Sequence, residues 1–168
     1  MPGTPYARDM TSAPPPLFRG PWSPGEVAAF LADSVIPVRL GVDAGPGGPL
    51  VVSLWFLPDG LELVGASRPT STLIRCLERR PACGFEVAAD APPYRGVRGR
   101  ATVDLDRSAG ADTLDRLLER YLGSVDVPLG ARLRERADDE VAFRLRPLSI
   151  TSWDYRERMT TSLPDRAR

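Results

Sequence analysis

The chain has 168 residues, the length of one ordinary domain, and its 22 basic and 22 acidic residues give a formal net charge of zero. All basic residues are arginine, and the sequence contains no lysine, histidine, asparagine or glutamine. Without lysine there is no Schiff base or P-loop lysine, and without histidine there is no histidine-based triad or imidazole metal ligand. The remaining polar groups suit the binding of an anionic, planar cofactor that brings its own chemistry.

The sequence also indicates where the protein works. No apolar run is long enough to span a bilayer, and the N-terminus lacks the pattern of a signal peptide. The two cysteines, Cys76 and Cys83, have neither CxxC nor metal-ligand spacing. We therefore expect a reduced, cytoplasmic protein with no membrane partner.

Three segments are expected along the chain. Residues 1–20 are rich in Pro, Ser, Thr and Gly and predict a disordered N-terminal tail. Residues 21–157 predict the folded domain, and residues 158–168 predict a frayed C-terminal tail. The domain opens with the capping box Ser23-Pro24-Gly25-Glu26, which predicts a helix that ends near Ala32.

A block of strands follows this helix. The alternating residues 36–42 predict one strand, and the glycine- and proline-rich segment 43–49 predicts a hairpin turn. Residues 50–57 are apolar on both faces and predict a second strand. After a tight turn at 58–60, residues 61–66 predict a third strand, so that the three form a meander.

The second half of the sequence mixes helices and strands. The hydrophobic spacing predicts helices at 68–79, at 112–122 and within 127–136. It predicts strands at 83–88, 97–105, 141–146 and 148–153. Many strands and few helices indicate a mainly β protein, an antiparallel β-barrel with helical insertions.

Hydroxyl and arginine side chains gather where the third strand gives way to a helix. The cluster contains Ser67, Arg68, Thr70, Ser71 and Thr72. A helix N-terminus presents free N–H groups and partial positive charge, so this cluster suits a phosphate. The alternative is that the hydroxyls only cap the helix, through Thr70 or Ser71.

Several stretches in a fixed order resemble a known family. They are residues 36–42, the strand Val51-Val52-Ser53-Leu54-Trp55-Phe56, and residues 59–63, 77–81, 93–101, 120–123 and 147–154. Together they resemble the pyridoxamine 5′-phosphate oxidase-like proteins, which include FMN and deazaflavin (F420) reductases. The resemblance spans residues 30–156 and implies an FMN-binding split barrel. In that fold two chains form a homodimer, and two cofactors lie in the groove between them.

The resemblance implies roles for particular residues. The phosphate of the cofactor is expected at the cluster that begins with Ser67. Many family members have a lysine in the first turn of the following helix, where this chain has Leu73, and Arg68 or Arg75 is expected to substitute for it. Ser53 and Trp55 share one side of a strand, with Leu54 between them, and this segment is expected to lie along the flavin ring.

Further candidates lie near the C-terminus of the domain. Arg98 and Arg100 share a strand face and are expected to reach the cofactor or the dimer interface. A nucleic-acid interface is not expected there, because the net charge is zero and a second basic patch is lacking. Trp153 and Arg156 are expected to contact the cofactor of the partner chain, or alternatively to anchor the last strand.

The composition and the family resemblance together predict a function. The chain is expected to be an FMN- or F420-dependent oxidoreductase that acts on an unidentified small molecule, with the cofactor carrying hydride. No carboxylates show paired acid–base spacing, so no catalytic residue and no metal ligand is assigned. The alternative is a non-catalytic protein that binds a flavin or another planar ligand, with haem disfavoured by the lack of histidine.

Overall fold

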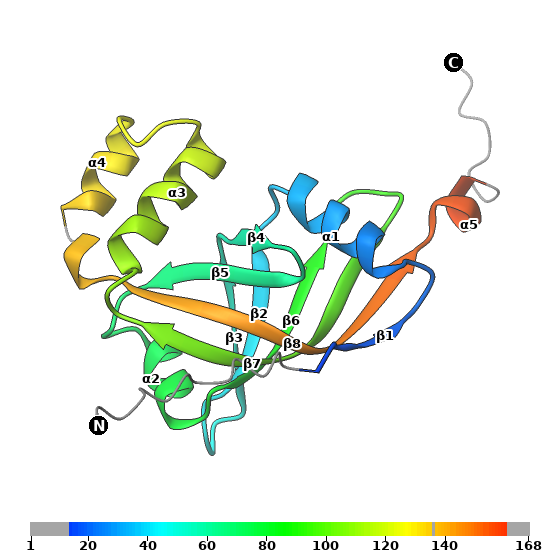
Figure 1. The fold of residues 1–168 in the computed structure, drawn as a ribbon, viewed down its shortest axis with the longest axis horizontal. Coiled ribbons are helices and arrows are strands. Elements are labelled where there is room, and N and C mark those ends of the chain that lie inside the picture. The colour runs from blue at the N-terminus through cyan, green and yellow to red at the C-terminus, as the bar shows by residue number, and fades with distance from the viewer. Residues whose placement is uncertain (1–13, 136, 161–168) are drawn as a thin grey trace, which may run out of the picture.

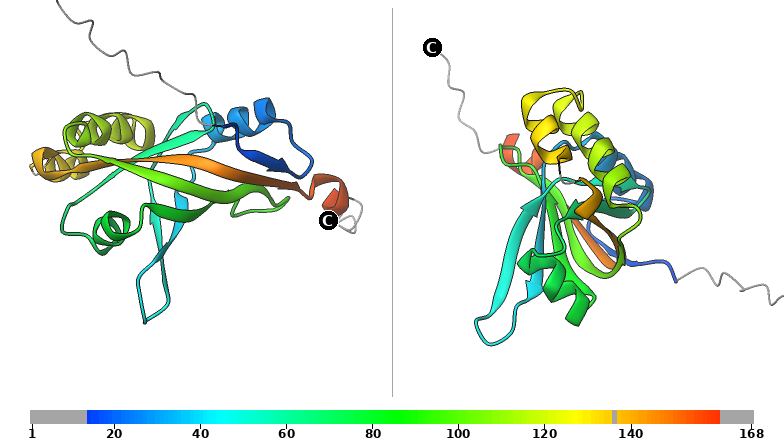
Figure 2. Two further views of the ribbon diagram at one scale, coloured as in Figure 1. Left: turned by 60° about the horizontal axis from the view of Figure 1, so that its bottom comes forward. Right: turned by 90° about the vertical axis from the view of Figure 1, so that its left-hand side faces the viewer.

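A single sheet of eight strands curls on itself in the computed structural model, which describes residues 14–135 and 137–160 (Figure 1). Seven strands follow the order β3-β2-β6-β7-β8-β5-β4, and every neighbouring pair on this path is antiparallel. The hairpin of β2 and β3 runs across the direction of β7 and β8, which gives the sheet its strong curvature (Figure 2). The predicted mainly β barrel with helical insertions is confirmed.

The strands and helices have the following bounds. The strands are Leu17–Arg19 (β1), Val38–Asp43 (β2), Pro49–Leu54 (β3), Leu57–Asp59 (β4), Glu62–Ser67 (β5), Ala82–Ala88 (β6), Arg95–Asp106 (β7) and Val141–Asp154 (β8). The helices are Pro24–Asp33 (α1), Thr72–Arg79 (α2), Gly110–Leu122 (α3), Pro128–Arg134 (α4) and Arg156–Thr160 (α5), with a 3₁₀ turn at Ala137–Asp139 (η1). The capping box that predicts α1 is present, with Ser23 and Glu26 bonded to each other's backbone N–H groups.

The barrel is open between β3 and β4, which are the two ends of the ordered path. The prediction of one strand over 50–57 is therefore wrong, because β3 ends at Leu54 and the chain crosses to a new strand that pairs with β5. The crossing consists of Trp55 and Phe56. Phe56 is fully buried in the barrel core, whereas Trp55 packs into a second cluster outside the barrel. These two environments bend the chain at this point.

Alternation along the strands separates the core from the outer face. Val38, Leu40 and Val42 on β2 point into the core, together with Val141, Phe143 and Leu145 on β8. The second hydrophobic cluster lies on the outer face of β4 and β5, where α3 covers it. Its buried members are Leu57, Val64 and Leu117, and the partly buried Trp55, Ala66 and Tyr121 pack against them. The opening of the barrel thus lies next to α3.

The two ends of the domain differ from the expectation. The tail predicted for residues 1–20 is interrupted by β1, which pairs in parallel with residues 149–151 of β8. Likewise, residues 156–160 form α5, which includes the first three residues of the predicted tail at 158–168. Residues 1–13 and 161–168 lie outside the described residues. The two predicted closing strands are one strand. Pro147 pairs with Ala101, and only Leu148 is skipped, at a register shift in the ladder with β7.

The structure also bears on membrane-spanning helices, metal ligands and cysteines. In the described ranges, no helix is long and apolar enough to cross a membrane. No cluster of potential metal ligands occurs among the same residues. Cys76 and Cys83 are both free and buried, and burial raises the pKa of the Cys83 thiol to about 12.

Candidate functional site

A cavity of about 510 Å³ lies beside the opening of the barrel, between the end of β3, the end of β5 and helices α3 and α4. Six of the predicted site residues line it, namely Ser53, Leu54, Trp55, Ser67, Arg68 and Ser71. The first three come from the end of β3, and the other three come from the junction of β5 and α2. The structure therefore brings two separate predicted groups to one place.

The position of Trp55 is fixed by a tyrosine of α3. The rings of Trp55 and Tyr121 stack with centroids 4.9 Å apart and planes 10° apart. The Tyr121 hydroxyl accepts a bond from the Phe56 N–H and donates to the Ile36 carbonyl, each at 3.3 Å. Helix α3 thus holds the crossing between β3 and β4 in place and gives the cavity an aromatic wall.

The junction between β5 and α2 supplies the polar end of the cavity. Ser71 is the N-cap of α2, and its hydroxyl accepts bonds from the Ile74 N–H and from the Ser67 hydroxyl, both at 3.1 Å. The capping interpretation is confirmed for Ser71. The helix begins at Thr72 and not at Arg68, because Pro69 disfavours helical backbone at the residue before it. The Arg68 side chain remains exposed at the cavity wall.

Other members of the predicted phosphate cluster point elsewhere. Thr70 is exposed and does not line the cavity. Arg75 donates to the Thr72 hydroxyl at 3.4 Å, and both residues line a separate groove on the outer side of α2. Leu73, which stands where many family members have lysine, is buried in the barrel core. Of the two predicted substitutes for that lysine, only Arg68 reaches the cavity.

The remaining wall of the cavity comes from residues that sequence reasoning did not assign to the site. Four leucines of α3 and α4 form an apolar surface: Leu114, Leu117, Leu129 and Leu133. Helical periodicity marks Leu114 and Leu117 as an apolar face but does not show what that face covers. Glu140, just before β8, completes the wall, and no local pattern in the sequence distinguishes it. Burial raises the pKa of this carboxyl, and the nearby charge of Arg68 opposes the rise.

The predicted residues near the C-terminus lie away from this cavity. The Arg98 guanidinium lies 5.5 Å from the centre of the Trp153 ring, on the outer face of β7 and β8. Arg156 forms an ion pair of 2.7 Å with Asp154, which also accepts a bond of 3.2 Å from the indole N–H of Trp22. Within one chain, these residues anchor the last strand and do not join the Ser67 group.

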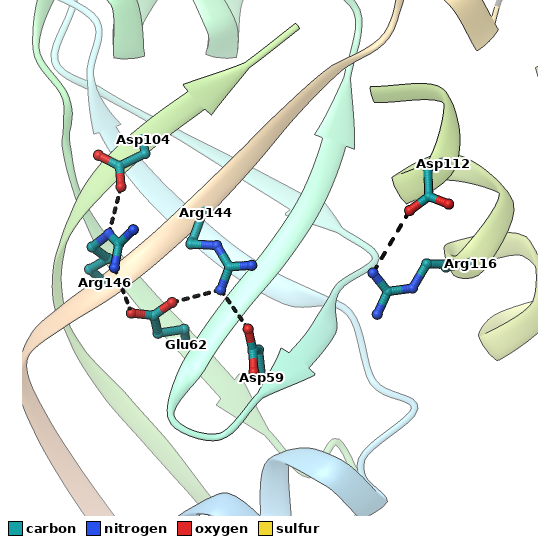
Figure 3. A network of polar contacts seen from close by, with 7 residues as sticks. All are labelled: Asp59, Glu62, Asp104, Asp112, Arg116, Arg144 and Arg146. Carbon is teal, nitrogen blue, oxygen red and sulfur yellow. Dashed lines mark hydrogen bonds and ion pairs between the residues drawn. The ribbon is translucent and has the colours of Figure 1, made fainter. Parts of the chain in front are cut away.

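A network of ion pairs occupies the outer face of β4, β5, β7 and β8 (Figure 3). Arg144 lies 2.7 Å from both Asp59 and Glu62, and Arg146 contacts Glu62 and Asp104. Hydrogen bonds to Asp59 and Glu62 raise the pKa of Arg144, and the bond to Asp104 raises the pKa of Arg146. Both arginines are already paired with carboxylates, so this face is not a second anion site.

The strand order, the opening between β3 and β4 and the external helices define a split β-barrel. A conserved hypothetical protein of Mycobacterium tuberculosis has a similar structure, with a TM-score of 0.68 and 23% identity over 88% of this chain and 92% of that chain. An F420 reductase matches with a TM-score of 0.61 and 24% identity, over 71% of this chain and 92% of its own. A proposed pyridoxamine 5′-phosphate oxidase of Listeria innocua matches with a TM-score of 0.59 and 18% identity, over 77% of this chain and 96% of its own.

These identities are below 25%, so the likeness is one of fold. No protein-family model and no curated protein matches the sequence. The chain has the split-barrel fold of the pyridoxamine 5′-phosphate oxidase-like proteins, as the sequence resemblance implies.

Proposed function

We propose that the chain binds a flavin-type nucleotide, FMN or F420, in the 510 Å³ cavity and acts as an oxidoreductase on a small molecule. The observation that carries this proposal is the convergence of Ser53, Leu54 and Trp55 with Ser67, Arg68 and Ser71 on that cavity. These are the residues that the family resemblance assigns to the flavin ring and to the phosphate.

The cavity fits such a ligand in size and chemistry. Its volume falls within the range of about 300–1,000 Å³ that is usual for cofactor sites. Arg68 offers a bidentate cation, and the first N–H groups of α2 provide a partial positive charge beside it. Trp55 and the leucines of α3 and α4 offer an apolar wall for a planar ring. A phosphate at Arg68 and a ring against Trp55 are therefore the favoured arrangement.

The protein groups in this arrangement bind and orient the ligand. A flavin or deazaflavin supplies the hydride chemistry when bound. The apolar wall excludes water from one face of the ring, and Arg68 fixes the end that carries the phosphate. No side chain of the cavity is assigned an acid–base role.

We also propose that two copies of the chain form a homodimer through the outer face of the sheet. Gly41 and Gly84 lie side by side there, and an added Cβ at Gly41 would meet nothing within 4 Å. Val51 pairs with Gly41 and is 65% exposed. Such a flat surface permits close approach of a second backbone. The next row of paired residues on the same face begins at Ser53, which also lines the cavity, and continues through Arg39, Glu86 and Arg98 to Thr151. The proposed interface therefore borders the cavity.

The oligomeric state tests this interface. Val51→Arg places a charge on this face beside Gly41, so we expect light scattering to show a dimer for the wild-type protein and a monomer for the variant. Val35→Arg changes an exposed residue in the loop before β2 and is the matched control. A monomeric wild-type protein would contradict the proposal.

A second candidate function is non-catalytic binding of the same ligand. It is favoured by the burial of Leu73, which leaves Arg68 as the one cation among the residues that line the cavity. Turnover separates the two candidates. An oxidoreductase oxidises NAD(P)H or reduced deazaflavin in the presence of an acceptor, whereas a binding protein retains the ligand without turnover.

The experiment that tests binding is a titration of the purified protein with FMN and, separately, with F420, followed by absorbance and fluorescence. We expect Arg68→Ala to weaken binding by about 1.5–3 kcal/mol, the range for a hydrogen bond to a charged group. Arg75→Ala removes a neighbouring arginine outside the cavity and is expected to leave affinity unchanged. Equal effects of the two substitutions would contradict the assignment of Arg68. Failure of the wild-type protein to bind either ligand would refute the proposed function.

A further inference from the structure

A second cavity, of about 410 Å³, lies between α1 and the start of β7, and it shares no lining residue with the cavity proposed for the flavin. Two aromatic residues of this α1 cavity pack together, because the rings of Trp22 and Phe30 lie 5.0 Å apart at 46°. The Trp22 indole N–H donates to Asp154 at 3.2 Å, and its backbone N–H donates to the Ser152 hydroxyl at 3.0 Å. These bonds fix an apolar wall before any ligand enters.

The charged residues of the α1 cavity fall into two groups. They are Glu26, Asp33, Arg95 and Arg156. Glu26 accepts bonds from the N–H and the hydroxyl of Ser23, at 2.8 and 2.7 Å, as part of the capping box. Arg156 is paired with Asp154 at 2.7 Å. Within the described residues, by contrast, no hydrogen bond or ion pair reaches the side chain of Arg95 or Asp33. The cavity therefore presents one cation and one carboxylate without polar partners.

These two charged groups are neighbours of the same aromatic ring. The central guanidinium carbon of Arg95 lies 5.9 Å from the centre of the Phe30 ring. Asp33 follows Phe30 by three residues in α1, so the two residues share a face of the helix, with Cβ atoms about 5–6 Å apart. Val35, which is 53% exposed, adds apolar surface to the lining. A small ligand that covers Phe30 therefore meets both charges and the apolar wall.

The combination of groups restricts the chemistry of such a ligand. A simple carboxylate would gain Arg95 but face Asp33, and a simple amine would gain Asp33 but face Arg95. A zwitterion gains both, and an α-amino acid carries its carboxylate and its ammonium group on one carbon atom. We propose that the α1 cavity binds an α-amino acid with an apolar side chain. Its carboxylate binds Arg95, its ammonium group binds Asp33, and its side chain packs on the aromatic pair. This site is separate from the proposed flavin site.

The test compares four probes by titration calorimetry with the wild-type protein. L-phenylalanine carries all three features, its amide lacks the carboxylate, its N-acetyl derivative lacks the ammonium group, and glycine lacks the apolar side chain. The titrations are made at about pH 6, where the amino group of the amide is protonated. We expect phenylalanine to bind with a dissociation constant of about 1 mM or below, and each of the other probes to bind about fivefold to tenfold more weakly.

Two variants connect each charge of the ligand to its partner. Arg95→Gln should weaken phenylalanine binding about fivefold to tenfold and leave the amide unchanged, because the amide has no carboxylate to lose. Asp33→Asn should weaken phenylalanine binding to a similar degree and leave the N-acetyl derivative unchanged. Arg132→Gln and Asp126→Asn make the same charge changes at exposed residues outside the cavity, and they should change nothing.

Several results would overturn the proposal. Absence of phenylalanine binding at about 10 mM would show that the cavity is not an amino-acid site. Equal binding of phenylalanine, its amide and its N-acetyl derivative would show that the two charges do not act on the ligand, and this comparison needs no variant. Displacement of phenylalanine by FMN would show that the two sites are not separate. The flavin titration of the wild-type protein is independent of these measurements, so the proposed function and this inference can fail separately.

Discussion

Removal of one hydroxyl group tests how α3 holds the opening of the barrel. Tyr121→Phe keeps the ring that stacks on Trp55 but removes the oxygen between the Phe56 N–H and the Ile36 carbonyl. Phe56 is fully buried, so its N–H loses its partner at a place where water has little access. We expect the variant to fold with an intact barrel but with lower stability.

The size of the effect follows from the two hydrogen bonds. A hydrogen bond contributes about 0.5–1.5 kcal/mol net, and a buried donor left without a partner costs about 1–3 kcal/mol. Both bonds are 3.3 Å long, which places them at the weaker end of the range. We therefore expect a loss of about 1.5 kcal/mol in the free energy of unfolding. For a chain of this size, that corresponds to a fall of about 3–6 °C in Tm.

The measurement is urea unfolding followed by tryptophan fluorescence and, independently, by circular dichroism. Tyr155→Phe is the matched control, because Tyr155 is 44% exposed and its hydroxyl forms no hydrogen bond to the described residues. A loss below about 0.5 kcal/mol in Tyr121→Phe, or an equal loss in the control, would refute the role assigned to the hydroxyl.

Three further predictions concern packing, capping and pH. Gly65→Ala should lower the free energy of unfolding in urea by about 1–3 kcal/mol, because its methyl group would lie 2.3 Å from a buried phenylalanine ring. The control Gly47→Ala meets no atom within 4 Å and should lower it by less than about 0.5 kcal/mol. Arg120→Ala should cost about 2–3 kcal/mol in the same assay, since this guanidinium donates to three carbonyls at the end of α1, and Arg116→Ala should cost less than about 1 because its ion pair is exposed. Burial raises the pKa of Cys83 from 9.0 to about 12, so the folded state holds this proton more tightly than the unfolded chain and its contribution to stability is lost as pH rises above about 9. Cys83→Ala should flatten the alkaline fall in stability by up to about 1.4 kcal/mol per pH unit, and parallel pH curves would contradict this.

Local signals in the sequence account for much of the fold. The capping box at Ser23, the glycine-rich hairpin after β2 and the amphipathic residues of α3 each have a mechanism that operates within a few residues. The Ser67–Thr72 cluster is of the same kind, because a strand that ends in hydroxyls before a helix predicts an N-terminus, and Ser71 proves to be its cap. The ordered family resemblance then places Ser53 to Trp55 near this cluster.

The remaining features depend on contacts between distant parts of the chain. An apolar run such as 50–57 gives no sign of where the chain leaves one partner for another, since Trp55 and Phe56 are apolar in either arrangement. Pro147 suggests a break between two strands, whereas the observed register shift lets one strand continue through it. Glu140 lies at the end of an acidic stretch typical of a solvated turn, and only tertiary packing near Gly110 buries it.

The central place of β8 constrains how the protein is made. Strand β8 borders β7, β5 and β1, and it occupies residues 141–154. While the ribosome is still adding these residues, β5 and β7 of the nascent chain have no common neighbour, and both expose backbone groups that are open to pairing. The barrel can close only after residues 141–154 have been added, so folding of the sheet cannot finish before β8 is synthesised. Premature termination before residue 141 therefore leaves a product with open strand edges, which chaperones or proteases must intercept before it aggregates.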